Sequence, residues 1–491
     1  MTRKKFEQLI VIIFCVVVSY ILICTLCFDW VEYYLKKSFL LPNILNLVIA
    51  IGVGYLLWFC WNKIYHQGVF LKRLIICFSI LFFIQLIIAY CIYFDTGWDA
   101  GAIDNLANTF VANGNLSKSE YLSLYPNNML LTAILAFIKT IPFFGKYHFT
   151  IVAINVALVN LAGFFTVIII KRLIGEKQAL FAIIPVAILL LLSPWITIAY
   201  SDTFTILFPV AILYFYTNKR KSGLDYFLIF ALASIGYHIK PTSLIILIAI
   251  ILVEISSRRF KEIAAIFKKW KILACIILGI FSGFIINWCA TEYLGFSQNE
   301  NIRPTQFTHF LSMGQNDRTL GVWAVEDTDE AVDDGMSNTE RFWHRLSSRN
   351  FIEQISFFSR KLLLNYNDGT FAWGCEGNFY ANIPDEKGPL SAFLRNIFYS
   401  FGKYYVILSE IEQLVWIACL AGCLLIVFKK NKEKNILVIM LTIVGMTMFL
   451  LLFEPRARYL FCYVPVFIIG ASIGFTSVYR RIRASRAIIK T

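Results

Sequence analysis

Long apolar stretches separated by short polar ones recur along almost the whole chain. A helix of about 20 apolar residues crosses a hydrocarbon layer about 30 Å thick. The pattern therefore predicts an all-α polytopic membrane protein with about twelve membrane-spanning helices. The spans are expected at Phe6–Phe28, Leu41–Trp61, Leu71–Phe94, Phe149–Ile170, Leu180–Ile198, Thr203–Tyr216, Leu224–His238, Thr242–Ile255, Ile272–Tyr293, Tyr405–Phe428, Ile436–Leu452 and Leu460–Val478.

The composition leaves little material for a large aqueous domain. Hydrophobic residues make up 58% of the 491 positions and charged residues only 15%, whereas a soluble domain has about 25% charged residues. The first span follows Met1–Lys5 and has no small-residue cleavage site after it, so we interpret it as a retained helix. Most of the 12 cysteines fall within apolar spans, and their spacing matches neither a disulfide framework nor a zinc site.

Clusters of Lys and Arg mark the cytoplasmic loops, because short cytoplasmic loops hold an excess of basic residues. They occur at Arg3–Lys5, Lys72–Arg73, Lys171–Arg172, Lys219–Lys221, Arg258–Lys271, Lys429–Lys434 and Arg480–Arg486. All of them fall on one side if the apolar run Asn128–Phe144 lies along the membrane surface as an interfacial helix. Both termini are then cytoplasmic, and the segments Asp95–Asn127 and Glu292–Phe401 face outward. The net charge of +14 follows from this sorting and indicates no nucleic-acid partner.

Two acidic residues near the outward ends of spans are candidates for chemistry. Asp99 follows a long apolar span and Asp202 starts a later one. A carboxylate at the edge of a bilayer costs free energy, which makes it a functional candidate. Each acid also has a simpler explanation as an N-cap, because Asp is favoured at that position and both precede predicted helices. The acidic run Glu326–Asp334 is best explained as a solvated loop.

Three basic residues stand on the outer side, where the sorting rule would not place them. Lys240 lies at a turn between two short spans, and Arg456 and Arg458 stand close together beside Glu454. Arg303 is a weaker fourth. Each is alternatively an interfacial residue whose charged head reaches water. The forked, permanently charged guanidinium matches phosphate oxygens, which indicates a lipid phosphate or pyrophosphate as the ligand.

These groups together suit a group transfer at the membrane surface. One acid removes a proton from an acceptor hydroxyl, and the other holds the acceptor or a cation. A correctly placed general base contributes about two to four orders of magnitude in rate. The basic groups neutralise the phosphate as it leaves, and such stabilisation is often the larger effect.

Several motifs follow one another along the chain: Asp99, Tyr125-Pro126-Asn127-Asn128, Ser201-Asp202-Thr203, Thr308–Asn316 and Glu454–Tyr459. In this order they resemble the C-type glycosyltransferase superfamily (GT-C), and the last two are similar to a bacterial branch of it. The resemblance runs from about Leu71 to Tyr479. It implies a GT-C fold and the inverting transfer of a sugar from a polyprenyl-phosphate carrier to a cell-envelope acceptor outside the cytoplasmic membrane.

The resemblance also implies roles for individual residues. Asp99 matches the general base of the first outer loop and Asp202 the second-loop acid. The expected substrate-binding residues are Lys240, Arg456 and Arg458 near the carrier phosphate, with Arg303, Tyr125, His238, His309, Gln315 and Glu454. The superfamily often has paired acids in the first loop, whereas Ala100 and Gly101 follow Asp99 here. No cofactor or metal ion is therefore assigned, and a divalent cation stays an open alternative.

The same reading divides the chain into four parts. We expect residues 1–70 to form two additional spans, 71–291 the GT-C-like core with its outer catalytic loop at 95–148, 292–404 an extracytoplasmic region, and 405–491 the C-terminal spans and a basic tail. Three other functions stay open. A lipid-linked glycan flippase would carry charges in mid-span, a glycan polymerase or ligase would share the outer basic groups, and a structural membrane protein would tolerate the loss of Asp99.

Overall fold

The structure is a computed structural model that describes residues 3–28, 40–142, 148–256, 270–328 and 335–489. These residues form helices and loops, with a single isolated bridge between Asp95 and Asn382. The prediction of an all-α membrane protein is confirmed. In the described ranges, eight helical segments are long and apolar enough to cross a membrane. They are α1 (Arg3–Cys27), α2 (Asn43–Ile64), α3 (Phe70–Ile92), α7 (His148–Ile174), α15 (Trp270–Tyr293), α20 (Tyr405–Leu424) with η6 (Leu425–Phe428), α21 (Lys434–Leu452), and η7 (Ala457–Tyr463) with α22 (Val464–Ile489).

The remaining expected spans are shorter or broken. Three apolar pieces are α10 (Ser201–Phe204) with α11 (Leu207–Tyr216), α12 (Gly223–Ile239), and η4 (Pro241–Ser243) with α13 (Leu244–Ser256). The expected span Leu180–Ile198 is divided into α8 (Glu176–Phe181), α9 (Ile183–Val186), the π-helical η2 (Ala187–Leu191) and η3 (Pro194–Thr197). Pro185 and Pro194 lack the backbone N–H that a continuous helix needs. The count of twelve crossings stays a prediction.

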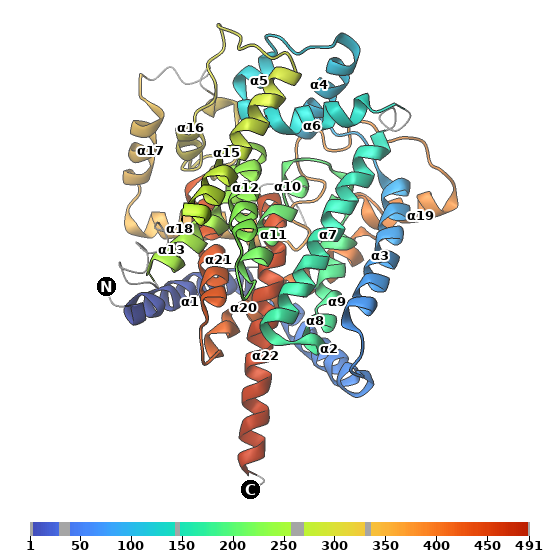
Figure 1. The fold of residues 1–491 in the computed structure, drawn as a ribbon, viewed down its shortest axis with the longest axis vertical. Helices are drawn as coiled ribbons and strands as arrows, with labels where there is room; N and C mark the ends of the chain where they lie inside the picture. The colour runs from blue at the N-terminus through green and yellow to red at the C-terminus, as the bar shows by residue number, and fades with distance from the viewer. Residues whose placement is uncertain (1–2, 29–39, 143–147, 257–269, 329–334, 490–491) are drawn as a thin grey trace.

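Short helices cover one end of the bundle, which we name the loop end (Figure 1). The first group is α4 (Asp99–Asn113), α5 (Glu120–Leu124), η1 (Pro126–Asn128) and α6 (Met129–Thr140). The second group is α16 (Phe307–Met313), η5 (Val325–Asp327), α17 (Asn338–Ser347), α18 (Phe351–Tyr366) and α19 (Pro389–Phe398). The expected interfacial helix at Asn128–Phe144 is found as α6, which packs on α4 and α15. The end of that run, at 143–147, lies outside the described residues.

The opposite end of the bundle, where α7 ends and α22 runs to the C-terminus (Figure 1), carries several basic residues. Arg172 at the end of α7 donates to the carbonyl of Tyr214 at 2.7 Å, and Arg480 of α22 donates to that of Ile174 at 2.8 Å. Lys177 is bonded to Asn62 of α2. The basic segment at 258–269 and the acidic positions 329–334 lie outside the described residues.

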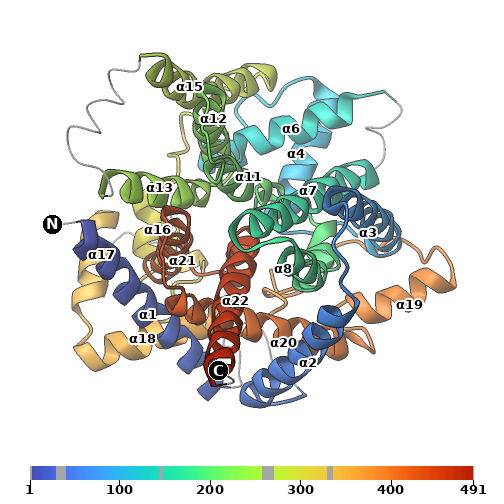
Figure 2. The same cartoon turned by 60° about the horizontal axis from the view of Figure 1, so that its bottom comes forward.

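A buried polar link attaches α2 to the rest of the protein. The amide of Asn43 donates to Asn367 at 2.8 Å and accepts from Gln413 of α20 at 2.9 Å. Asn46 donates to the Glu410 carboxylate at 2.5 Å. Figure 2 shows α2 beside α20. Sequence reasoning missed this link, because it treated Tyr405–Phe428 as uniformly apolar although two glutamates lie within it.

Candidate active site

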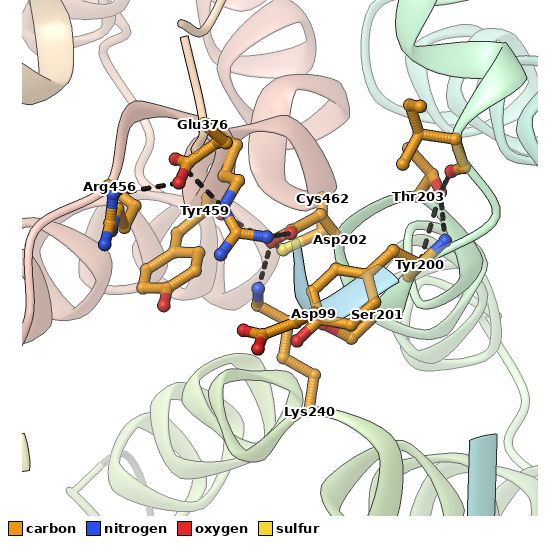
Figure 3. A network of polar contacts seen from close by, with 12 residues as sticks. Asp99, Tyr200, Ser201, Asp202, Thr203, Lys240, Glu376, Arg456, Tyr459 and Cys462 are labelled. Atoms are coloured by element: carbon orange, nitrogen blue, oxygen red, sulfur yellow. Dashed lines mark hydrogen bonds and ion pairs between the residues drawn. The ribbon is translucent and has the colours of Figure 1, made fainter. Parts of the chain in front are cut away.

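Ion pairs join acidic and basic side chains in a buried cluster (Figure 3). We name it the charge cluster; it consists of Asp202, Glu376, Glu454, Lys240, Arg456 and Arg458, all of which are buried. These residues come from α10, from the residue after α12, from the loop before α19, and from the turn between α21 and α22. The structure therefore brings Asp202 together with the three outward basic residues that the sequence singled out.

Asp202 bridges two cations from distant parts of the chain. One carboxylate oxygen is ion-paired with the Lys240 ammonium, and the other accepts from Arg458 at 2.9 Å. The backbone of Lys240 leaves the helical conformation directly after α12, with φ −151° and ψ 110°. The proline that follows explains this, because it disfavours a helical conformation for the residue before it. The Lys240-Pro241 pair thus creates the turn from which the ammonium reaches Asp202.

Glu376 joins the two arginines. Its Oε2 is 2.8 Å from a terminal nitrogen of Arg456, and its Oε1 is 3.3 Å from Nε of Arg458. Arg456 also donates from Nε to Glu454 at 2.9 Å, and the Tyr459 hydroxyl donates to the other oxygen of Glu454 at 2.7 Å. Burial raises the pKa of Glu454, but Arg456 and these hydrogen bonds outweigh it and hold the pKa below its usual range. Glu454 is therefore a carboxylate in the folded protein.

Aromatic rings enclose the cations. The Arg458 guanidinium lies 4.4 Å from the ring centre of Trp98 and 5.3 Å from that of Tyr200. The Lys240 ammonium lies 3.9 Å from the ring centre of Tyr459. Cation–π contacts stabilise charges that have lost water by up to about 2 kcal/mol. The rings therefore offset part of the cost of burying these cations.

Asp99 stands beside the charge cluster (Figure 3). It is half-buried and accepts a hydrogen bond from the Tyr121 hydroxyl at 3.2 Å. Asn128 donates to that same hydroxyl at 2.9 Å, which orients it toward Asp99. Burial raises the pKa of Asp99 above its usual value, although the positive charge of Arg458 and the Tyr121 bond both lower it. A carboxylate with a raised pKa accepts a proton more readily than an exposed one.

Neither Asp99 nor Asp202 is an N-cap residue, so the capping explanations for the two acids are wrong. The N-cap of α4 is Trp98 and that of α10 is Tyr200, so Asp99 and Asp202 already lie within the first turns. The two acids instead bond to Tyr121 and to the cations of the charge cluster. Their negative charges still lie near helix N-termini, where the helix dipole favours them.

Three of the expected substrate-binding residues lie outside the charge cluster. The Tyr125 ring packs on Tyr121 with 5.3 Å between ring centres, which places it one residue away from Asp99. His238 packs edge-on against Phe284 of α15 at 5.0 Å. Arg303 is exposed in the loop before α16, and its described contacts include none with the charge cluster. Of these three, the structure connects only Tyr125 to the centre through a described contact.

His309 and Gln315 are buried residues outside the charge cluster. His309 is buried in α16. The Gln315 amide donates to the carbonyls of Leu451 and Leu452 at 3.0 Å each, and it accepts from Arg349 at 2.8 Å. We expected Gln315 to contact substrate, but its amide is buried and engaged by protein groups. In this structure it holds the end of α21 in place.

Lys361 braces the same turn and was missed from the sequence. Its ammonium is fully buried in α18 and donates to the carbonyls of Gly314, Leu451 and Phe453 at 2.5, 2.8 and 2.9 Å. The carbonyls at the end of a helix have no partner within the helix, and Lys361 supplies one. Burial lowers the pKa of Lys361 well below its usual value. Because Phe453 directly precedes Glu454, these hydrogen bonds fix the start of the turn that carries Arg456 and Arg458.

Glu376 was also missed. It lies in a loop where Phe371, Ala372 and Gly374 have positive φ values of 55°, 60° and 79°. Residues other than glycine rarely adopt this conformation, and it persists where the surroundings enforce it. The Asp368 carboxylate enforces it here by accepting from the backbone N–H of Ala372 at 2.9 Å. The available signal was a single acid between two glycines in an outer loop.

Among the described residues, the charge cluster offers no set of free oxygen ligands for a divalent cation. A divalent cation takes several oxygen ligands, whereas Asp202 is occupied by Lys240 and Arg458. Across the described residues, no group of three His, Cys, Asp or Glu side chains is arranged to hold a metal ion. The mechanism proposed below therefore uses protein groups alone.

Comparisons with known proteins bear on the class of this chain. A family model described as conserved hypothetical integral membrane protein matches residues 3–479. Among solved structures, the chain is similar to the archaeal oligosaccharyltransferase AglB from Archaeoglobus fulgidus, in complex with an inhibitory peptide and a dolichol-phosphate, with 12% identity and a TM-score of 0.36. That alignment covers 84% of this chain and 51% of the enzyme, so the chain spans about half of the enzyme's length. No curated protein matches the chain. Because the family match extends over nearly the whole sequence, the chain belongs to the family of conserved hypothetical integral membrane proteins.

Proposed function

We propose that this protein is a membrane glycosyltransferase. It transfers a sugar from a polyprenyl-phosphate carrier to a hydroxyl of a cell-envelope acceptor, on the outer face of the cytoplasmic membrane and with inversion at the sugar carbon. One observation carries the proposal: Asp99, with its raised pKa, stands beside a buried cluster that holds Lys240, Arg456 and Arg458. The basic loops at the opposite end support an outward-facing loop end, because such loops favour the cytoplasmic side.

In this proposal Asp99 is the general base. The acceptor hydroxyl gives its proton to the Asp99 carboxylate while the acceptor oxygen bonds to the anomeric carbon of the sugar. The bond between that carbon and the carrier phosphate breaks, and its electron pair goes to the phosphate oxygen. Attack from the face opposite the phosphate inverts the configuration of the carbon. A base in this position contributes about two to four orders of magnitude in rate.

The cations stabilise the leaving phosphate. An ammonium has three donors and a guanidinium five, so Lys240, Arg456 and Arg458 can hold their carboxylate partners and phosphate oxygens at the same time. Asp202 and Glu376 keep these cations in place before the donor arrives. Donors that are already oriented in a site with little water stabilise developing charge strongly. Asp202 is thus a positioning residue in the proposed mechanism.

The charges balance during the proposed step. The three cations of the charge cluster cancel its three carboxylates, Asp202, Glu376 and Glu454, in formal charge. Asp99 loses its negative charge when it takes the proton, and the carrier phosphate gains one when the sugar leaves. The total charge of the site therefore stays constant, which limits the reorganisation that the buried groups undergo.

Reconstitution tests the proposal. The full chain is placed in liposomes with labelled polyprenyl-phosphate sugars and envelope polymers, and sugar transfer is measured. We expect transfer by the wild type and a loss of about two to four orders of magnitude in Asp99→Asn. Glu120→Gln is the matched control, since Glu120 is an exposed acid of the same segment. Wild-type transfer rates in Asp99→Asn contradict the base assignment, and movement of the donor across the bilayer without transfer favours a flippase.

A second experiment identifies the sugar and the acceptor. Mass analysis compares the envelope polymers of cells that contain the protein with those of cells that lack it. We expect one sugar substituent to disappear when the gene is deleted and to return with the wild-type chain. It should not return with Asp99→Asn. Identical polymers in all strains would contradict a transferase role in the envelope.

A further inference from the structure

A second polar site lies next to Asp99 but outside the charge cluster. It is a cavity of about 490 Å³ between the start of α4, the end of α6 and the start of α7. This volume falls within the range of about 300 to 1,000 Å³ that is usual for small-molecule sites. Its polar lining includes Asp95, Thr96, Asp104, Asn105, Asn108, Lys139, His148 and Asn382. None of the six charge-cluster residues lines it.

The polar groups of the cavity are held in place by one another. Lys139 of α6 donates to Asp104 at 2.9 Å and to Asn108 at 2.6 Å, so it ties two turns of α4 to α6. His148 Nδ1 lies 3.8 Å from Asp95 and 3.7 Å from Asp104. A site whose side chains are fixed before binding loses less entropy when a ligand arrives.

Two polar side chains of the lining are accessible to a ligand. Asn105 is exposed, and the Asp95 side chain keeps 47% of its surface accessible although it accepts from Asn382 at 3.0 Å. An amide and a carboxylate together offer donors and acceptors. Ligands rich in hydroxyl groups use both kinds of partner.

The formal charge of the lining argues against an anionic ligand. Asp95 and Asp104 face Lys139 and His148, so the formal sum is −1 with a neutral His148 and zero with a protonated one. Both oxygens of Asp104 already meet Lys139. A phosphate therefore meets no net positive charge here. The cavity therefore favours an uncharged polar molecule.

The cavity shares two backbone segments with the proposed catalytic centre. Ala100 and Gly101 line it directly after Asp99, and the stretch 197–199 lines it shortly before Asp202. Gly101 permits this arrangement, because an added Cβ would lie only 1.7 Å from the Thr96 carbonyl oxygen. The cavity therefore borders the first turn of α4, which also carries Asp99, although Asp99 itself does not line it.

We propose that this cavity is the acceptor subsite and that it binds one or two rings of an uncharged, hydroxyl-rich glycan. The assignment as an acceptor subsite rests on the proposed transferase function, whereas saccharide binding is measured without turnover. The glycan hydroxyls exchange hydrogen bonds with Asp95 and Asn105. The donor phosphate occupies the charge cluster, so donor and acceptor approach Asp99 from different sides.

The experiment measures saccharide binding to the full chain in a sugar-free amphipol. The probes are neutral mono- to trisaccharides of hexose and N-acetylhexosamine, with glucose 1-phosphate as the anionic comparison, and saturation-transfer NMR detects binding. We expect saturable binding of at least one neutral probe and weaker binding of glucose 1-phosphate. Asn105→Leu, which removes a polar group, and Ala381→Trp, which fills the rim, should each weaken neutral binding at least tenfold.

The controls separate this inference from the proposed function. Asn113→Leu, at the far end of α4, should bind the neutral probe as the wild type does. The inference is overturned if no neutral saccharide saturates the protein, or if Asn105→Leu and Ala381→Trp bind it unchanged. Cavity-dependent binding in a protein that transfers no sugar supports the saccharide site and refutes the transferase. If the protein transfers sugar in a manner that depends on Asp99, but both cavity variants keep the acceptor KM of the wild type, the transferase function stands and the acceptor subsite is refuted.

Discussion

Asp202 and Arg458 are 256 positions apart in the sequence, yet a 2.9 Å ion pair joins them in the fold. The same guanidinium lies 3.3 Å from Glu376. One arginine thus connects α10, the loop before α19 and the segment that leads into α22. These three elements meet at the proposed catalytic centre, so its geometry depends on long-range charge pairing and not on any one segment.

Removal of the Arg458 side chain should destabilise the protein strongly. Arg458→Ala leaves Asp202 and Glu376 with fewer positive partners in a buried site, and breaking a buried pair typically costs about 3 to 5 kcal/mol. We expect a lower unfolding temperature in detergent. The double variant Arg458→Ala/Asp202→Asn should recover part of the loss, because it removes a carboxylate left without its arginine. Strictly additive effects would show that the pair is not coupled.

Arg458→Lys should affect donor binding more than folding. The lysine keeps a positive charge beside Asp202 but loses the planar fork that a guanidinium offers to oxygens. If the cation holds the carrier phosphate, the donor concentration at half-maximal rate should rise about tenfold, which corresponds to about 1.4 kcal/mol. Initial rates over a donor series measure this. An unchanged donor KM would contradict the phosphate assignment.

The charge of Asp99 should lower stability at neutral pH. Burial raises its pKa in the folded protein above the unfolded value, so the folded state binds the proton more tightly. The stability that this provides is present at low pH and is lost as the pH rises through the folded pKa. Asp99→Asn should therefore unfold at a higher temperature than the wild type at pH 8, and this difference should shrink as the pH falls toward the ordinary pKa of an aspartate. A difference that stays constant over that whole pH range would contradict the raised pKa.

Tyr121→Phe should move the acid limb of the pH–rate profile. The Tyr121 hydroxyl donates to Asp99 and so favours its charged form. Without this bond the pKa of Asp99 rises further, and the general base becomes protonated at a higher pH. The rate should therefore begin to fall at a higher pH than in the wild type. Tyr55→Phe is the control, because Tyr55 is an exposed tyrosine of α2.

The fold class and the loop end could be predicted from the sequence, because both follow from local patterns. Apolar length predicted the long helices and the separate helix α6, whose position relative to the membrane stays a prediction. The proline after Lys240 and the basic pair at Arg456 and Arg458 predicted the cations of the site. These signals lie within a few residues of the groups that they identify.

The partners of these groups could not be predicted in the same way. Glu376 meets Arg456 across 80 positions and Lys361 meets Phe453 across 92. A lone acid or lysine in a long loop has no neighbouring pattern that reveals such a partner. The two neighbouring arginines, Arg456 and Arg458, gave only indirect evidence for a carboxylate partner, because buried cations are stable only when they are paired. An explicit search of the 292–404 segment for such acids would have included Glu376.

Lys361 provides the last prediction, because it acts on the proposed site only through the backbone. Lys361→Met removes three hydrogen bonds to the carbonyls of Gly314, Leu451 and Phe453 while preserving much of the side-chain volume. The Leu451 carbonyl keeps its bond from Gln315, but a buried carbonyl left without a partner costs about 1 to 3 kcal/mol, so the turn at 453–458 should loosen. We expect faster hydrogen exchange there and a donor KM several-fold higher, with the acid limb of the pH–rate profile unchanged because Asp99 is untouched. Lys403→Met, at an exposed lysine, should alter neither measurement. Unchanged exchange at 453–458 in Lys361→Met would mean that α21 and α18 hold the arginines without this ammonium.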